Sequence, residues 1–572
     1  MKKYKTADGY NVYRIKKGSK SHELAHRKTY QKDIDDLLGT LDDIKYDSII
    51  FIFGIDTGGY LGALSRLLCS KNKVVIFEPS AEVFEQYNPR IAEQIQLVFY
   101  EKDQLKNFFD KHINSVNFNN LYFHAFGNYA KIYKEEYDHL VETLDWAYIN
   151  ASSQLVLANR FREVFIQNML ANLKILNKAT PIHHYLFTNK NVPAIIVSAG
   201  PSLDKHIQVM AAHKNRLKDY FIIAGSRTVR ALIQNDIKPD MILSIDPIDA
   251  NYDMMKEHLD LDVPLVFYEY SNRYLVKDYQ GEKIYIASLL PKVIKAFRHL
   301  KGAYLGGSVA HTCIDMANML GCSPIVLVGQ DLAYTYDKHH SDTATYERDK
   351  TLKYESQITV EDVFGNQVKT TLTLNHFRKK LEDYIALYQS KTDVAFINCS
   401  YGAKIEGAAH KELSEIFKSS IPYASKKTLT PYKDIVIESK AAADTILRYI
   451  DECLEKAGQG LELCNTIILE NSEKSLIDVE EKDIDLQRIL YILKLVNEFE
   501  NAAESHYLGG YFSKFKYDIK QNAFNMFAKD YDRLTSDLQH QAQAFKAYFQ
   551  AMQEMLEEVK HIGCETVTEF YK

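Results

Sequence analysis

Four short apolar runs in the middle of the chain restrict the fold more than any other feature of the sequence. They are Ala194–Val197, Phe221–Ala224, Met241–Ser244 and Ile325–Val328, and each is followed by small or polar residues. Segments long enough to form helices lie between them. Short apolar runs that end in turn residues are typical of buried parallel strands. The sequence therefore predicts an α/β domain built on a parallel sheet.

Small and polar residues follow these runs at the points where the predicted strands end. In open α/β sheets, ligands bind outside the carboxyl ends of the strands, so residues at these ends share one edge. We expect a single site at this edge. The residues that the pattern brings there are Gly200, Ser202, Ser226, Asp246, Gln330 and Asp331.

Composition indicates a globular chain of several domains. The 572 residues suffice for two to four domains, and the 46% hydrophobic content provides ample core. A net charge of -6 is not that of a dedicated nucleic-acid binder, and no apolar run reaches the ~18 residues that a membrane helix needs. Seven cysteines without a C-x-x-C pattern, and an N-terminal segment without an apolar signal core, lead us to expect a soluble cytoplasmic protein with free thiols.

A second strand–loop–helix–strand unit precedes the central region. The run Ser48–Phe53 leads into the glycine-containing segment Gly54–Gly59, and the run Val74–Phe77 ends at Glu78. An acid at about this distance from the first glycine, roughly 20 residues, is typical of dinucleotide-binding units. However, the glycines do not follow the G-x-G-x-x-G pattern, and Asp56 would repel a phosphate. We interpret the unit as a structural Rossmann-like domain, with nucleotide binding as the alternative.

Helical patterns connect and end the chain. Phe161, Phe165, Met169 and Leu173 recur every four residues in a long predicted helix that leads into the central domain. The pattern from about residue 430 to the end is helical throughout. We therefore predict three domains: a Rossmann-like α/β domain with the connecting helix at 1–178, a central α/β domain at 179–425 and an all-helical domain at 426–572.

Two segments of the central domain have more than one interpretation. Gly200 and Pro201 can bring the backbone close to a ligand and set its direction, and Ser202 can cap a helix whose amides face an anion such as a phosphate. A plain turn between strand and helix is the alternative. The polar stretch from Tyr334 to Gln367 is interpreted either as a mobile lid over the site or as plain surface disorder.

Five motifs in the same order resemble one protein family. They read VSAGPSLD, AGSRTVRALIQNDIKPDMILSIDP, YLGGSVAHTCIDMANMLGCSPIVLVGQDLAYT, KHH and NCSYGAKIEG, and together they cover roughly residues 180–420. In combination they resemble the motility accessory factor (Maf) proteins, glycosyltransferases that modify flagellin. The flanking regions resemble the family only in general layout.

The resemblance implies a central domain similar to bacterial sialyltransferases, with a CMP-activated nine-carbon sugar acid as donor. Ala199 stands where the sialyltransferase G-N-G-P-S loop has asparagine, and Ser226 stands where a second asparagine is expected. Gly307–Ser308 matches the turn of small residues that binds the donor. The donor-binding residues implied are Ser198, Gly200, Pro201, Ser202, Ser226, Gly307, Ser308, Gln330 and Tyr334.

The catalytic base is less directly implied. The sialyltransferase histidine should fall near residues 369–373, where this chain has none. His340 matches the family's histidine after the D-L-A-x-T motif and is our first candidate to accept the proton of an attacking hydroxyl. Asp246 and Asp331 are alternatives, either as the base or as ligands of Mg²⁺ or Mn²⁺. A metal is not required, because Tyr334, Tyr336 or Lys338 could neutralise phosphate.

The family suggests an enzyme that transfers a nonulosonic acid, such as a pseudaminic or legionaminic acid, from its CMP-activated form to Ser or Thr of flagellin. This modification would serve flagellum assembly and motility. A related archaeal branch that shares the G-P-S-L and G-Q-D-L motifs diphosphorylates a pterin alcohol with ATP, which is one alternative. The other is a non-catalytic flagellin-binding export or assembly factor.

Overall fold

The computed structural model describes residues 1–86, 94–288, 302–346, 357–418, 439–470, 484–522 and 527–571, with residues 290, 298, 300, 349 and 524. These residues form two compact units. Unit 1 consists of Met1–Arg162 and Tyr449–Lys560, and unit 2 of Glu163–Arg448 and His561–Lys572. The division into three domains stays a prediction, and its boundary at residues 425 and 426 lies outside the described residues.

Unit 1 contains a parallel four-stranded sheet with the order β6-β5-β4-β7. The predicted runs form its two central strands, which are buried along most of their length. A small antiparallel sheet, β1-β2-β3, precedes it. The strands are β1 (Lys2–Lys5), β2 (Asn11–Lys17), β3 (Lys20–Glu23), β4 (Ile49–Phe53), β5 (Lys73–Glu78), β6 (Ile95–Phe99) and β7 (Leu121–Ala125).

The glycine loop of unit 1 is closed by its own side chains. Glu78 is fully buried and accepts hydrogen bonds from the Ile55 N–H (3.1 Å) and the Tyr129 hydroxyl (2.8 Å). A Cβ on Gly54 would lie 2.2 Å from the Tyr129 ring. The acid that would bind a ribose in a dinucleotide site is therefore engaged in holding the loop, which favours the structural interpretation of this unit.

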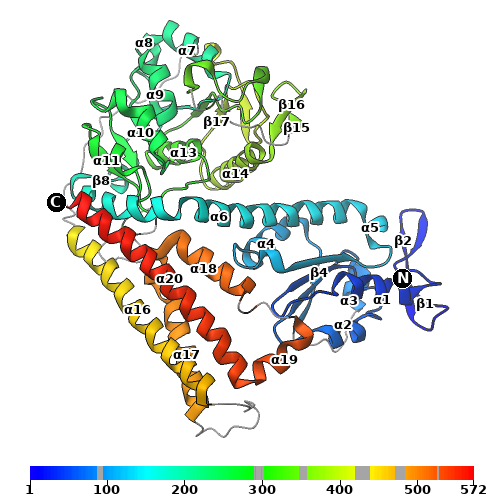
Figure 1. Cartoon of the computed structure of the whole chain (residues 1–572). Coiled ribbons are helices and arrows are strands. Elements are labelled where there is room, and N and C mark those ends of the chain that lie inside the picture. Colours follow the sequence, from blue (N-terminus) through cyan, green and yellow to red (C-terminus); the bar gives the residue numbers. More distant parts are fainter. Residues whose placement is uncertain are drawn as a thin grey trace. The chain divides into compact units, whose positions relative to one another are not determined.

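Helices complete unit 1 (Figure 1). The C-terminal helices belong to the same unit as the N-terminal sheet: the Ala528 N–H donates to the Ile44 carbonyl (3.0 Å), and the Tyr46 and Tyr531 rings stack at 5.3 Å. The helices are α1 (Tyr30–Thr40), α2 (Leu61–Leu67), α3 (Ala81–Gln86), α4 (Leu105–His112), α5 (Tyr129–Ile132), α17 (Ile484–Asn501), α18 (Gly509–Asn522) and α19 (Ala528–Ser536), with parts of α6 (Lys134–Ile175), α16 (Ser439–Glu470) and α20 (Leu538–Phe570).

Unit 2 is built on a nine-stranded sheet with the order β18-β17-β14-β9-β10-β11-β12-β13-β8, in which every pair is parallel. The four predicted runs form the adjacent strands β14, β9, β10 and β11. The strands are β8 (Thr180–Pro181), β9 (Ala194–Val197), β10 (Phe221–Gly225), β11 (Met241–Leu243), β12 (Leu265–Phe267), β13 (Lys283–Tyr285), β14 (Ile325–Val328), β17 (Phe396–Asn398) and β18 (Ala408–His410).

Helices cover both faces of this sheet, since neighbouring residues of a strand point to opposite sides. Ile196 packs in one core cluster with residues of α13 and α14, while Ile195 packs in another with residues of α7, α9 and α15. The helices are α7 (Leu203–Ala212), α8 (Lys214–Leu217), α9 (Ser226–Ile233), α10 (Asp249–Met255), α11 (Arg273–Asp278), α13 (Val309–Met319), α14 (Leu372–Gln389) and α15 (Leu413–Lys418).

The polar stretch from Tyr334 to Gln367 is partly structured. Its described residues include the 3-10 turns Thr335–Asp337 and Asp342–Ala344 and the strand β15 (Gln357–Glu361), which pairs with β16 (Gln367–Thr371) as an antiparallel hairpin. Tyr334, Thr335, Ser341 and Ala344 are buried. Residues 347, 348 and 350–356 of the predicted lid lie outside the described residues.

These elements confirm the predicted fold class: a mixed α/β protein with parallel sheets and a helical C-terminal region. Among the residues that the structure describes, none of the helices has the length and apolar composition that crossing a bilayer requires.

Two asparagines of α6 attach this helix to strand-end loops of unit 2. The Asn168 side chain donates to the carbonyls of Pro247 and Tyr270 (both 2.9 Å), and the Asn172 side chain to those of Glu269 (3.0 Å) and Ser271 (2.8 Å). Both asparagines are buried, at 0% and 1% exposure. A spacing of four residues places them on one face of the helix. They therefore fix the loops that follow β11 and β12.

We expect Asn172→Ala to destabilise unit 2, because two buried carbonyls lose their donor at a cost of ~1–3 kcal/mol. Thermal and denaturant unfolding would measure the change. Asn159→Ala, at an exposed position of the same helix, is the matched control and should behave as the parent. Equal unfolding curves for Asn172→Ala and the parent would show that these hydrogen bonds do not hold the loops.

Candidate active site

A cavity of about 260 Å³ lies at the carboxyl ends of the unit 2 strands. The chain order along the sheet reverses between β9 and β14, and such a switch point is where α/β sheets bind ligands. The volume is close to the lower end of the ~300–1,000 Å³ typical of small-molecule sites. Eight of the twelve predicted site residues line it: Ser198, Gly200, Ser226, Asp246, Ser308, Gln330, Asp331 and His340.

The other four predicted residues do not line this cavity. Pro201 and Ser202 are buried beside it, and the Gly307 N–H donates to the Leu305 carbonyl (2.6 Å). Tyr334 is 6% exposed, and its N–H donates to the Lys369 carbonyl (2.8 Å). Their predicted contacts with a donor stay predictions.

The Asp331 carboxylate joins two strand-end turns. Its Oδ2 accepts from the Ser202 hydroxyl (2.7 Å) and from the Ser202 N–H (3.1 Å), and both residues are at most 1% exposed. The prediction that the Ser202 side chain caps α7 is wrong, because the hydroxyl makes no capping hydrogen bond and serves Asp331 instead. Burial raises the pKa of Asp331, and the hydrogen bond from Ser202 opposes this shift.

Glycine permits close contact between these turns. A Cβ on Gly200 would lie 2.3 Å from Asp331 Oδ2, and one on Gly402 would lie 2.2 Å from the Asp331 carbonyl. The Gly200 N–H donates to the Gly329 carbonyl (2.7 Å). Gly200 therefore admits a neighbouring strand end, whereas the sequence suggested that it admits a ligand.

His206 of α7 forms hydrogen bonds with two of the strand-end turns. The sequence did not predict a role for this residue. Its Nδ1 accepts from the Gly329 N–H (3.3 Å), and its Nε2 lies 2.8 Å from the Cys399 carbonyl. These partners require a neutral ring with the proton on Nε2. Burial lowers the pKa of His206 to about 4, in agreement with this geometry. A histidine four residues after a turn serine carries no sequence signal of its own.

His340 lines the cavity and is partly exposed. Burial, Arg227 and His339 together lower the pKa of His340 to about 3, so its imidazole is neutral at neutral pH. The His339 ring lies edge-on to it at 4.3 Å. A neutral imidazole facing a cavity can accept a proton from a hydroxyl.

The two candidate aspartates differ in their surroundings. Asp246, which follows β11, is exposed and lines the cavity, while Asp331 is buried against Ser202. Within the described ranges, no three His, Cys, Asp or Glu side chains form a group that could hold a metal ion. A cation at this edge would therefore need other oxygen ligands besides Asp246, such as hydroxyls, carbonyls, water or substrate oxygens.

Arg227 lies in the motif AGSRTVRALIQNDIKPDMILSIDP, but the sequence did not predict a function for it. It is the only Lys or Arg among the described residues that line the cavity. Its position directly after Ser226, at the end of β10, is the signal that could have identified it. Ser198 also lines the cavity, and its hydroxyl oxygen is buried with no hydrogen-bond partner among the described residues.

The segment 369–373, where a sialyltransferase would carry its histidine, lies beside the cavity-lining turn. The Thr370 hydroxyl donates to the Leu332 carbonyl (2.8 Å), and Thr371 caps α14 by accepting from the Leu374 N–H (3.1 Å). The segment therefore contacts a cavity-lining residue, Leu332, but none of its own residues is among the described residues that line the cavity. The similarity to sialyltransferases stays a prediction.

Known proteins resemble this chain in structure more than in sequence. The structure of the MAf glycosyltransferase from Magnetospirillum magneticum AMB-1 is similar to this chain, with a TM-score of 0.56 and 13% sequence identity. The alignment covers 100% of this chain and 92% of the Magnetospirillum chain. A family model described as 6-hydroxymethylpterin diphosphokinase MptE-like matches residues 167–337. A search of curated proteins gives no match. The chain therefore has the fold of a Maf glycosyltransferase along its whole length.

The neutral state of His206 predicts a pH dependence of stability. Its folded-state pKa of about 4 lies below the ordinary value of 6.5, so the unfolded chain binds the extra proton between these values. Stability is complete above the ordinary value and falls as the pH drops through this window. His206→Gln keeps a donor and an acceptor but cannot titrate.

We expect His206→Gln to reduce the slope of unfolding free energy against pH by up to about 1.4 kcal/mol per unit, the value for one proton. Denaturant titrations from about pH 7 to about pH 4.5 would measure it. His258→Gln, in the surface turn Lys256–His258, is the control and should keep the parent slope. A parental slope in His206→Gln would contradict the assigned protonation state.

Proposed function

We propose that this protein is a glycosyltransferase that transfers a nonulosonic acid from its CMP-activated donor to Ser or Thr of flagellin. The observation that carries the proposal is the switch-point cavity with His340, in a chain whose full length has the fold of a Maf glycosyltransferase. The motif resemblance of residues 180–420 to the Maf family supports the donor and the acceptor.

The proposed reaction is a displacement at the anomeric carbon of the sugar acid. The acceptor oxygen forms a bond to this carbon, the bond from carbon to the phosphate oxygen breaks, and CMP leaves with the electron pair. His340 takes the hydroxyl proton. Its low pKa keeps it neutral at neutral pH, and a bound phosphate would raise that pKa and so favour proton uptake. Asp246 is the alternative base, or with a divalent cation a ligand.

A second candidate is a pterin diphosphokinase that uses ATP. The family model that matches residues 167–337 favours it, and this match includes β9 to β14 and the turns after them, but not the cavity-lining residues His339, His340, Leu374 and Phe377. The full-length likeness to a Maf glycosyltransferase favours the first function, since it includes both units. A non-catalytic flagellin-binding factor is the remaining alternative.

Intact-mass analysis of flagellin distinguishes these functions. Flagellin co-expressed with this protein and a pathway for a CMP-nonulosonic acid should gain whole multiples of the sugar mass. We expect His340→Ala to reduce the rate of transfer by about 10²–10⁴, the usual contribution of a positioned base. His339→Ala is the matched neighbouring change and should be much milder.

Unmodified flagellin together with turnover of ATP and a pterin alcohol would replace the first function by the second. Flagellin that binds the protein and stays unmodified, with no turnover of either substrate, would indicate the binding factor. Parental transfer by His340→Ala with an inactive Asp246→Asn would assign the base to Asp246, and loss of activity on chelation would then indicate a metal.

A further inference from the structure

The cation of the cavity is paired with a carboxylate of the protein itself. Arg227 Nη1 lies 2.6 Å from Asp349 Oδ2, and Nη2 lies 3.4 Å from Oδ1, so the two side chains meet as a two-pronged pair. The side chains are 21% and 7% exposed. A guanidinium binds a carboxylate or a phosphate in this same geometry. Asp349 thus occupies Arg227 in the manner of an anionic ligand.

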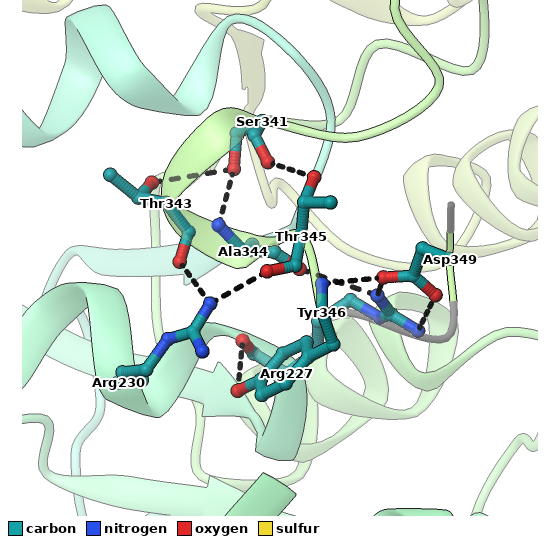
Figure 2. A network of polar contacts seen from close by, with 8 residues as sticks. All are labelled: Arg227, Arg230, Ser341, Thr343, Ala344, Thr345, Tyr346 and Asp349. Carbon is teal, nitrogen blue, oxygen red and sulfur yellow. Dashed lines mark hydrogen bonds and ion pairs between the residues drawn. The ribbon is translucent and has the colours of Figure 1, made fainter.

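Several contacts besides the pair hold the segment 341–346, which precedes Asp349 in the chain; one of them comes from Arg227, whose guanidinium also donates to the Ala344 carbonyl (3.3 Å). The Arg230 guanidinium donates to the carbonyls of Thr343 (3.2 Å) and Thr345 (2.7 Å) and lies 4.1 Å over the Tyr346 ring (Figure 2). Asp204 accepts from the Thr343 hydroxyl (2.6 Å). The segment can therefore keep its place when the pair between Arg227 and Asp349 opens.

An anionic ligand in this cavity needs a positively charged group to bind it, because the other charged lining residues are acidic. The acidic residues that line the cavity are Asp246 and Asp331, and His340 adds no positive charge near neutral pH because its pKa is lowered to about 3. Loss of the carboxylate partner would leave a partly buried guanidinium unpaired, which is unfavourable in free energy because the charge is only partly solvated. Exchange of one anion for another keeps it paired throughout.

We propose that Arg227 binds the anionic group of the nucleotide donor, phosphate or carboxylate, and that the Asp349 carboxylate holds this guanidinium until the ligand's anion replaces it. The identity of the donor rests on the proposed function, whereas the exchange does not. Asp349 therefore competes with the ligand and weakens its binding. Figure 2 shows the pair beside the anchored segment.

The test is the affinity for CMP, ATP and inorganic phosphate by titration calorimetry. Asp349→Asn keeps an oxygen for the Tyr346 N–H, which donates to Asp349 at 2.8 Å, but it removes the competing charge. We expect it to bind the preferred probe on the order of tenfold more tightly, and Arg227→Gln to bind at least about tenfold more weakly. In the double variant, Asp349→Asn should bring no gain, because its effect requires Arg227.

Asp342→Asn is the matched control: it removes an acidic charge from an exposed side chain of the same segment, so its affinity should equal that of the parent. If Arg227→Gln does not fold, Arg227→Lys keeps the charge without the fork and should still weaken binding. If CMP does not bind, but the affinity for ATP or phosphate changes in the Arg227 and Asp349 variants as expected, the exchange of anions is supported and the proposed CMP-activated donor is rejected. Unchanged affinity in Asp349→Asn, an equal gain in the Arg227→Gln background, or no binding of any probe would overturn the exchange.

Discussion

The hydrogen bonds of Asp331 are the interaction on which the candidate site depends. Its carboxylate accepts from the hydroxyl and the N–H of Ser202, and its carbonyl accepts from the Ala403 N–H (2.8 Å). Three strand-end turns, which follow β9, β14 and β17, are joined through this one residue. Such close contact is possible because Gly200 and Gly402 have no side chain. These hydrogen bonds hold together the turns at this end of the cavity.

The residues that hold the turns in place differ from the residues that can contact a ligand. Three buried residues position the turns around the cavity, because their polar groups hydrogen-bond to neighbouring turns: Ser202, Asp331 and His206. The groups left to meet a ligand come from the rim: Asp246, His340 and Arg227. A preformed frame that aims a few polar groups at a cavity is what a transferase needs to orient two substrates.

The sequence was informative where a residue's role depends on its neighbours along the chain. Apolar runs predicted β9, β10, β11 and β14 and their shared edge, because strand burial is a local pattern. Pairing between distant turns could not be predicted in this way. The hydroxyl of Ser202 was assigned to a helix cap because its partner, Asp331, is 129 positions away. His206, and the pairing of Arg227 with Asp349, were missed for the same reason, since the partners come from turns far along the chain.

A crystal structure of the protein with CMP tests the central claim most directly, because it locates the nucleotide without reference to any activity. We predict that CMP lies in the cavity at the ends of β9 and β14, with its phosphate paired to Arg227 and the Asp349 carboxylate displaced. CMP bound in unit 1, at the loop between Gly54 and Glu78, would contradict this account. So would CMP in the unit 2 cavity with the pair between Arg227 and Asp349 intact.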